Sequence, residues 1–463
     1  MTEASLTERL ARFAGSPLAD PPYDAIAIAK SGFADTIATM LAGREEPVVG
    51  IVRRFVAARQ SGCREACLLL GAEHAASADA ALVNGTSAHA LDYDDVALGG
   101  HPSTVLVPAV LAEGERLDAS GAEALRAYLV GYEVWAELAA REPDALHEKG
   151  WHPTAVLGTV AAAAAVCQLR RLPADRSRHA LALAGSMASG LVANFGTMTK
   201  PLHAGRAAAC GIDAVRLAAD GLTAAPDALE HHAGYLAALS PRGRTDRAEN
   251  AAMLGRRWRI LDAGLSIKQY PMCYSAHRTI DGVLELVAAN DVAADDVREV
   301  RATIGTAQAS MLRNHAPVTV LEAKFSLEFA VAAALVSRRV SLRELTDAFV
   351  ADPRVRRAMA KVRIATTDSR CPIEPVFAFS DRVVLDLADG RTLDSGEIRF
   401  ARGSAQRPLQ PQELEAKFMD CAAGAEGVDA GVLHDRLRGL DTLGSVRGLR
   451  ETGAQRRKPH LGG

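Results

Sequence analysis

The spacing of hydrophobic residues along most of this chain is that of α-helices. Between residues 26 and 40, isoleucine, phenylalanine and methionine recur mostly at steps of three to five residues, which predicts a helix that Gly43 ends. Aromatic residues make up only 5% of the chain and alanine is abundant, which favours closely packed helices over a sheet-dominated fold. Further helices are predicted over residues 66–70, 80–83, 104–117, 122–140, 155–169 and 227–239, and an alanine-rich helix that follows Arg206 is predicted to end near Gly221.

The pattern changes near residue 265, where alternating segments appear. Residues 297–306 alternate between apolar and polar side chains, which predicts a strand, and Asp389-Gly390 predicts a hairpin turn. The helical pattern returns at Pro411. We therefore predict a mainly α protein in which a large all-helical domain, discontinuous and made of residues 1–264 and 403–463 with a tail, carries a smaller α+β domain over 265–402. Within the smaller domain, strands are predicted over 362–366, 383–387 and 392–400, and helices over 276–289, 323–336 and 342–349.

The stretch from residue 84 to 108 concentrates ionisable side chains. His89 and Asp92 stand three apart, so on a helix they would share a face. Asp92, Asp94 and Asp95 crowd one turn, and like charges this close are seldom packed without a use or a counter-charge. His101 then precedes a predicted helix, with Ser103 or Thr104 as its N-cap, where backbone N–H groups favour anions. The competing interpretation is a polar helix end with a solvated acidic turn.

Two later segments share features with that stretch. Gly150-Trp151-His152-Pro153-Thr154 again places histidine and proline directly before a helix, and proline suits the first helical turn. Lys200, His203 and Arg206 follow one another at steps of three, which would put three potential cations on one side of a helix. Such a group suits a ligand that carries carboxylates. A capping or packed histidine and a solvated basic turn are the alternatives.

Composition narrows the classes of function. The formal net charge of the 463 residues is −3, so no basic field for nucleic acid and no polybasic segment for a membrane surface is expected. The seven cysteines are scattered and odd in number, which is typical of reduced cytosolic thiols. The N-terminus has no apolar signal-peptide segment, and the apolar run 155–166 is too short for a bilayer. We expect a cytoplasmic protein.

Taken together, the motifs resemble those of the MmgE/PrpD family, which includes 2-methylcitrate dehydratase, cis-aconitate decarboxylase and iminodisuccinate epimerase. The resemblance extends from about residue 20 to 425, with the motifs in the same order and spacing. They are Asn84-Gly85, His89-Ala90-Leu91-Asp92-Tyr93-Asp94-Asp95, His101-Pro102-Ser103, Trp151-His152-Pro153-Thr154, Thr199-Lys200-Pro201-Leu202-His203-Ala204-Gly205, Lys268-Gln269-Tyr270-Pro271-Met272-Cys273 and Lys324-Phe325-Ser326-Leu327.

The resemblance implies a large helical domain, a smaller α+β lid and a homodimer. It also implies a site between the domains that uses neither metal nor organic cofactor and binds a small polycarboxylate. Carried over residue by residue, it points to a catalytic set and to a lesser set that would bind substrate. The catalytic set is Asp92, His101, His152, Lys200 and Lys268, and the lesser set is His203, Tyr270 and Cys273.

These residue types suit proton abstraction next to a carboxylate. A histidine is the natural proton carrier near neutral pH, and Asp92 is expected to orient His101 as a carboxylate does in a catalytic triad. Lys200 and Lys268 would stabilise the charge that develops. Asp94 and Asp95 are expected to be structural, through capping or pairing with arginines. Elimination by a hydro-lyase is our first expectation, and an epimerase or isomerase of an imino- or hydroxy-dicarboxylate is the alternative.

Three positions depart from the decarboxylase pattern within the family. That branch has threonine after the paired aspartates, histidine at the place of Cys273 and tyrosine at that of Phe329, whereas this chain has Val96, Cys273 and Phe329. Loss of three polar groups from one pocket makes a cis-aconitate decarboxylase the weaker expectation. Cys273 is either a proton carrier, as in two-base epimerases, or a buried small hydrophobe. A binding protein without catalytic activity is a further alternative.

Overall fold

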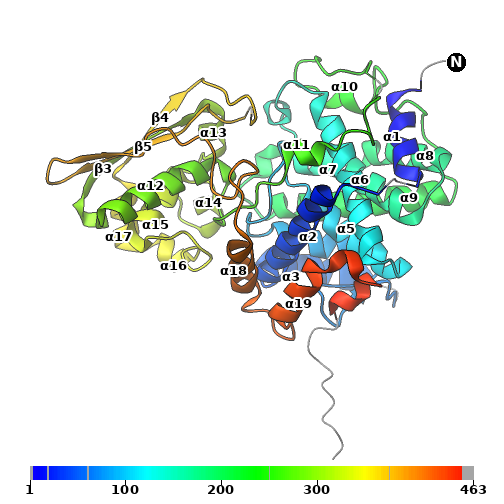
Figure 1. The fold of residues 1–463 in the computed structure, drawn as a ribbon, viewed down its shortest axis with the longest axis horizontal. Helices are drawn as coiled ribbons and strands as arrows, with labels where there is room; N and C mark the ends of the chain where they lie inside the picture. Colours follow the sequence, from blue (N-terminus) through cyan, green and yellow to red (C-terminus); the bar gives the residue numbers. More distant parts are fainter. Residues whose placement is uncertain (1–3, 18–19, 60–61, 250, 375, 451–463) are drawn as a thin grey trace, which may run out of the picture.

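The structure is a computed structural model that describes residues 4–17, 20–59, 62–249, 251–374 and 376–450. We call residues 265–402 the lid and the remaining described residues the helical body; Figure 1 shows the two side by side. The body begins with eleven helices and a two-stranded hairpin. These are α1 (Leu6–Gly15), α2 (Tyr23–Gly43), α3 (Pro47–Arg59), β1 (Ala66–Cys67), β2 (His74–Ala75), α4 (Ser77–His89), α5 (Ser103–Leu117), α6 (Gly121–Ala140), α7 (Pro153–Arg170), α8 (Ala174–Met187), α9 (Thr199–Ala219), α10 (Tyr235–Leu239) and α11 (Arg259–Ala263).

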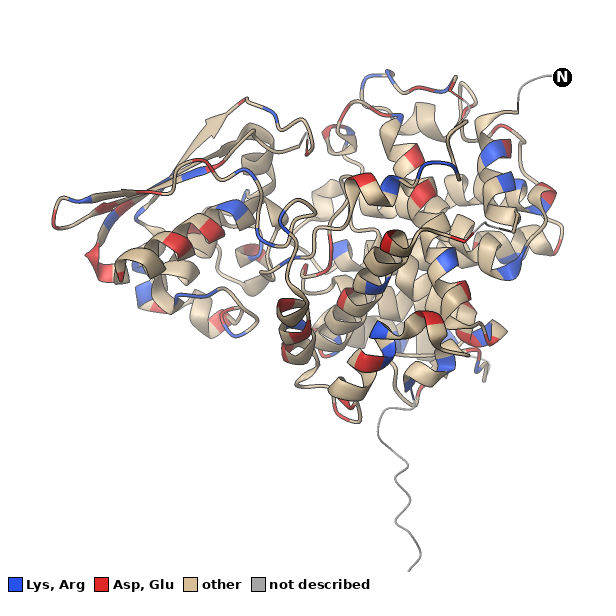
Figure 2. Cartoon of the chain, viewed as in Figure 1, with Lys and Arg blue, Asp and Glu red and all other residues tan. Residues whose placement is uncertain are grey.

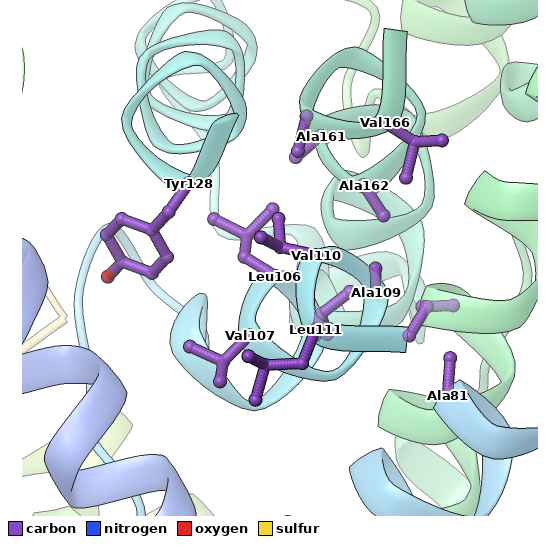
Figure 3. Close-up of a cluster of buried hydrophobic side chains, with 14 of the residues drawn as sticks. Ala81, Leu106, Val107, Ala109, Val110, Leu111, Tyr128, Ala161, Ala162 and Val166 are labelled. Atoms are coloured by element: carbon purple, nitrogen blue, oxygen red, sulfur yellow. The ribbon is translucent and has the colours of Figure 1, made fainter. Parts of the chain in front are cut away.

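The core of the body is built from small and medium-sized side chains. Leu106 and Val110 of α5 meet Tyr128 of α6 and Ala161 of α7 in one buried cluster (Figure 3). Because alanine adds so little bulk, the axes of these helices can approach closely. The alanine-rich composition therefore translates directly into the tight helical packing that the sequence predicts.

Helices α4 and α9 approach one another at two glycines. A Cβ built on Gly85 would lie 2.8 Å from the Cα of Gly205, and one on Gly205 would lie 2.1 Å from the Leu82 carbonyl oxygen. Neither distance is tolerable for a side chain, so only glycine permits this contact. It fixes α4 relative to α9. Asp92 lies in the turn that follows α4, and Lys200 lies in the first turn of α9.

Two body helices, α2 and α7, are long and apolar enough to cross a membrane. However, 61% of the apolar window of α2 and 89% of that of α7 are buried inside the protein, as expected for core helices.

Lysine, arginine, aspartate and glutamate are interspersed over the body and the lid in Figure 2. No single-sign face is visible in that view, in keeping with the small net charge.

The lid is a four-stranded sheet with helices packed on it and has its own hydrophobic core. The strand order is β4-β3-β5-β6, in which β3 pairs with β4 in parallel and with β5 antiparallel. The antiparallel β5–β6 hairpin turns at Gly390, whose φ of 91° suits glycine. The lid elements are α12 (His277–Asn290), β3 (Val297–Gly305), α13 (Thr306–Met311), α14 (Val320–Ala323), α15 (Leu327–Ser337), α16 (Asp347–Val350), α17 (Pro353–Met359), β4 (Val362–Thr367), β5 (Arg382–Leu387) and β6 (Thr392–Asp394).

The C-terminal helices pack on the body. Helix α18 (Pro411–Ala422) and α19 (Ala430–Arg438) both contact α2, and Phe418 and Leu433 join the body core. The domain boundaries at 264 and 402 remain a prediction: Leu265 and Ile267 still belong to the body core, and Phe195 of the body joins the lid core. Short 3-10 turns complete the chain: Leu146–Lys149, Val192–Asn194, Tyr274–Ala276, Ala294–Asp296, Leu440–Thr442 and Val446–Arg450.

Several predicted helices are shorter or absent. Residues 66–70 are not helical: β1 is followed by a turn in which Leu69 and Leu70 have left-handed φ values. Side chains from elsewhere bind this backbone, since Glu115 accepts from the Cys67 N–H and Asn84 from the Leu69 N–H. The predicted helix over 323–336 is divided, and Lys324 lies between α14 and α15. The predictions over 227–239 and 342–349 were also too long, since only α10 and α16 form there.

Candidate active site

A cavity of about 480 Å³ is lined by residues of both the body and the lid. It brings together six of the eight residues singled out from the sequence, while His203 and Tyr270 are not among those that line it. Other side chains on its wall include Phe195, Tyr274, Phe325 and Phe377. The six are Asp92, His101, His152, Lys200, Lys268 and Cys273.

Asp92 lies in a turn just after α4. The helix ends at His89, and Asp92 has a left-handed φ of 52°, so the prediction that His89 and Asp92 share a helix face was wrong. Lys200 donates a hydrogen bond to one carboxylate oxygen of Asp92, and the Lys268 Nζ lies 3.1 Å from the other. Burial alone would raise the pKa of the Asp92 carboxyl, but the two ammonium groups hold it below its usual value.

His101 is oriented by Asp94. Its Nδ1 lies 2.9 Å from Asp94 Oδ2 and 2.8 Å from the Asp95 carbonyl oxygen, whereas its Nε2 is 3.8 Å from Asp92 Oδ1. The expectation that Asp92 orients His101 was therefore wrong, because the backbone turn directs Asp92 to the lysines. Two acceptors at Nδ1 place the proton there and leave the Nε2 lone pair free. Burial lowers the pKa of His101, so this imidazole is neutral at neutral pH.

Asp94 contacts a second imidazole on its other side. The Nδ1 of His89 lies 2.9 Å from Asp94 Oδ1, and the rings of His89 and His101 are 4.5 Å apart between centroids. Burial lowers the pKa of His89 to about 3. Asp94 thus pairs with histidines and not with arginines as expected, while Asp95 accepts from the Ser103 N–H at 3.3 Å and caps α5. Ser103 itself is the first residue of that helix and not its N-cap.

His152 enters the cavity from the start of α7. Its Nδ1 lies 3.2 Å from Nδ1 of His203, and its ring meets the edge of Phe195 with centroids 4.8 Å apart. Burial, followed by the charge of Lys200, holds the pKa of His152 well below its usual value. His203 therefore contacts His152 without lining the cavity itself. Arg206, the third residue of the predicted cationic group, is exposed.

The lid side of the cavity is less polar than the motifs suggested. Tyr270 donates to Asp281 at 2.6 Å and is buried in the lid core; Tyr274 lines the cavity instead. Cys273 faces the cavity but is buried, and burial raises the pKa of its thiol. Of the three departures from the decarboxylase pattern, Val96 and Cys273 line the cavity, whereas Phe329 is fully buried elsewhere in the lid core.

Two arginines on the cavity wall were not predicted from the sequence. Arg257 pairs with Asp262 at 2.8 Å, and Arg259 pairs with Glu137 at 2.9 Å. Both are partly exposed, with 66% and 36% of their side-chain surfaces open to solvent. No motif marks them, because an arginine in a polar connection resembles any surface cation.

A group of four side chains has the donor atoms of a cation site. One donor atom from each of His89, Asp92, Asp94 and His101 lies within 4.8 Å of the others. The carboxylate of Asp92, however, already carries two lysine ammonium groups, whose charge repels a further cation. The residues present therefore fit a site in which lysines supply the positive charge.

The arrangement thus gathers histidine, lysine and aspartate side chains on the wall of one cavity. The chain belongs to the MmgE/PrpD family: the N-terminal domain model of that family matches residues 8–248, and the C-terminal domain model matches residues 270–431. The chain is therefore an enzyme of the MmgE/PrpD type, similar to lyases.

Curated relatives that match this chain are named cis-aconitate decarboxylase. The human protein is 30% identical over 353 residues, which cover 73% of this chain and 71% of the relative. The mouse protein is 28% identical over 352 residues, covering 73% and 70%, and the Aspergillus terreus protein is 27% identical over 352 residues, covering 71% of each. These identities support membership of the family. The reaction depends on the polar side chains that line the cavity.

Proposed function

We propose that this protein is a lyase that acts on a small polycarboxylate by removing a proton from a carbon next to a carboxylate. The observation that carries the proposal is His101, a neutral imidazole whose Nδ1 is held by Asp94 and whose Nε2 is free at the cavity. A general base needs just this combination of a fixed tautomer and an open lone pair. The cavity of about 480 Å³ is ample for a substrate of the size of citrate or aconitate.

The lysines supply the charge that an anionic substrate requires. Lys200 and Lys268 place two ammonium groups at this wall, where both contact the Asp92 carboxylate. When a proton leaves the carbon, negative charge spreads onto the adjacent carboxylate. Fixed ammonium groups in a site largely shielded from water stabilise that charge as it develops.

Our first proposal for the reaction is elimination of water. The substrate C–H proton goes to His101, its electron pair forms the carbon–carbon double bond, and the C–O bond to the β-hydroxyl breaks. The departing hydroxide takes a proton from an acid of the cavity, for which the new imidazolium and the two lysine ammonium groups are the candidates.

Decarboxylation of cis-aconitate is the second candidate, and the names of the curated relatives favour it. In that reaction a carbon–carbon bond to a carboxylate breaks and a carbon is protonated. Val96 and Cys273 stand on the cavity wall where the decarboxylase pattern has polar groups, which favours elimination. An epimerase remains the alternative outside the lyases, but the raised pKa of the Cys273 thiol disfavours it as a second base.

We also propose a cytoplasmic homodimer that needs neither metal nor organic cofactor. The seven cysteines are free thiols, which supports a reducing compartment. The lysines at Asp92 support charge stabilisation by side chains.

Proton NMR in heavy water tests the proposal. The purified enzyme is incubated with citrate, methylcitrate isomers, cis- and trans-aconitate, malates and imino acids derived from aspartate. We expect a C–H next to a carboxylate to exchange for deuterium. A vinylic signal without carbon dioxide selects elimination, carbon dioxide release from cis-aconitate selects decarboxylation, and inversion alone selects an epimerase. Neither exchange nor turnover with any of them would contradict the proposal.

A further inference from the structure

Four lysines are buried in the part of the chain that the structure describes, and all four converge on one short segment. Lys200 and Lys268 bind the Asp92 carboxylate, and Lys268 also donates to the Asp92 carbonyl oxygen at 2.6 Å. Lys324 donates to the Ala90 carbonyl oxygen at 3.0 Å, and Lys417 to that of Tyr93 at 2.8 Å. Burying an ammonium group is costly, so four of them gathered on residues 90–93 require a reason.

Residues 90–93 have two unfavourable properties that contacts with ammonium groups can offset. It follows the C-terminus of α4 at His89, where carbonyl groups lack helical partners and the helix dipole favours cations. Asp92 also has a φ of 52°, a left-handed conformation that is unfavourable for a residue with a side chain. The turn therefore persists because its surroundings hold it.

Lys417 joins three parts of the site. It comes from α18, and besides the Tyr93 carbonyl it donates to the Lys268 carbonyl oxygen at 2.8 Å. It forms an ion pair with the buried Asp35 at 2.6 Å, and its Nζ lies 4.0 Å from the centre of the Tyr93 ring. One ammonium group thus ties the Asp92 turn to the segment that carries Lys268.

We propose that Lys324 and Lys417 are positioning residues for the candidate active site. They hold the carbonyls on either side of Asp92, from the lid and from the C-terminal helices, so that its carboxylate stays between Lys200 and Lys268. Neither side chain acts on the substrate. The expected effect of these lysines on catalytic turnover rests on the proposed function. Their effect on the conformation of residues 90–93 can be measured without substrate.

Lys324→Met is the cleaner test, since Lys324 has no carboxylate within ion-pair distance among the described residues and methionine keeps most of its shape. Hydrogen exchange of the ligand-free enzyme, followed by mass spectrometry, is expected to rise about tenfold or more in peptides that span residues 88–98, the change that follows from loss of about 1.4 kcal/mol of local protection. Peptides of α7 should be unchanged. Lys361→Met is the matched control, because it removes a lysine bond of 3.0 Å to the Ala294 carbonyl in the lid.

The double variant Lys417→Met with Asp35→Asn tests the second lysine. Removing Lys417 alone would leave Asp35 buried without its cation and unfold the protein for an unrelated reason. With both charges removed, exchange of residues 88–98 is expected to rise again. Asp35→Asn alone keeps the lysine contacts with the Tyr93 and Lys268 carbonyls and should change exchange of that segment less than the double variant.

Turnover supplies a second readout on whichever polycarboxylate of the NMR panel reacts. We expect kcat to fall about tenfold or more with KM within about threefold, as when a catalytic group moves by roughly 1 Å while the binding surface is retained. Unchanged exchange at 88–98 in both variants overturns the proposal, and so does a rise spread evenly over the body. If no polycarboxylate reacts, the proposed function fails, while the exchange experiment still decides the role of these lysines.

Discussion

The two histidines that precede helices α5 and α7 share a local sequence but differ in what stands behind them. His101 and His152 are each followed by proline, and both line the cavity. Behind His101 stands a carboxylate, Asp94, at 2.9 Å; behind His152 stands another imidazole, His203, at 3.2 Å. The same pattern in the sequence therefore leads to two different electrostatic environments.

That difference assigns different tasks to the two rings. Asp94 raises the pKa of His101 against the effect of burial, so His101 can accept a proton and have its charge balanced. Burial lowers the pKa of His152, and the positive charge of Lys200 and the neighbouring His203 lower it further. Protonation of His152 is therefore disfavoured by both neighbours, Lys200 and His203. We therefore expect His101 to be the base and His152 to remain a neutral hydrogen-bonding group.

The largest expected effect is that of His101→Asn. Loss of the base should lower kcat/KM about a thousandfold, within the range of general base catalysis, with the thermal midpoint changed by only a few degrees. His152→Asn is the matched comparison and should cost clearly less. Steady-state kinetics on the reactive polycarboxylate measures both. Equal losses would remove the distinction between the two rings.

Asp94→Asn should have the next largest effect, about a hundredfold in kcat, because the amide no longer fixes the tautomer or balances the imidazolium of His101. It also gives a directional test in pH. The base must be unprotonated, so activity falls as pH drops through the His101 pKa. Since Asp94 raises that pKa, the variant should lose activity only at lower pH than the wild type. A profile that moves to higher pH would contradict the assignment.

The smallest expected effect is that of His203→Asn. It replaces one neutral hydrogen bond behind His152, which is worth a factor of about three to ten. The pH profile should stay where it is, because His203 does not contact His101. A shift of the acidic limb in this variant would show that the two histidine groups titrate together.

Helix positions in the body could be predicted from the sequence because the alanine-rich segments repeat with a clear period. Helix α6 covers Gly121–Ala140, where 122–140 was predicted. The gathering of Asp92, His101, His152, Lys200 and Lys268 followed only from the family resemblance, since no local pattern relates segments this far apart in the sequence. The turn at Asp92 was missed for a physical reason: its left-handed φ depends on lysines from distant segments.

Lys417 shows most clearly that contacts between distant segments could not be predicted from the sequence. In the sequence it is one of several polar residues in an ordinary amphipathic helix, yet in the structure it reaches the Tyr93 and Lys268 carbonyls. Asp94 was likewise placed among structural residues, because an acidic run does not reveal which member faces a histidine.

The glycine contact between α4 and α9 has a consequence for engineering. Because Gly85 and Gly205 meet backbone to backbone, the distance between α4, which leads into the Asp92 turn, and α9, which carries Lys200, does not depend on how other side chains pack. Libraries that vary Tyr274, Phe377 and Arg259 on the cavity wall can therefore search for new substrates while the proton-transfer apparatus keeps its dimensions. Substitution of either glycine would instead alter the spacing on which every such variant relies.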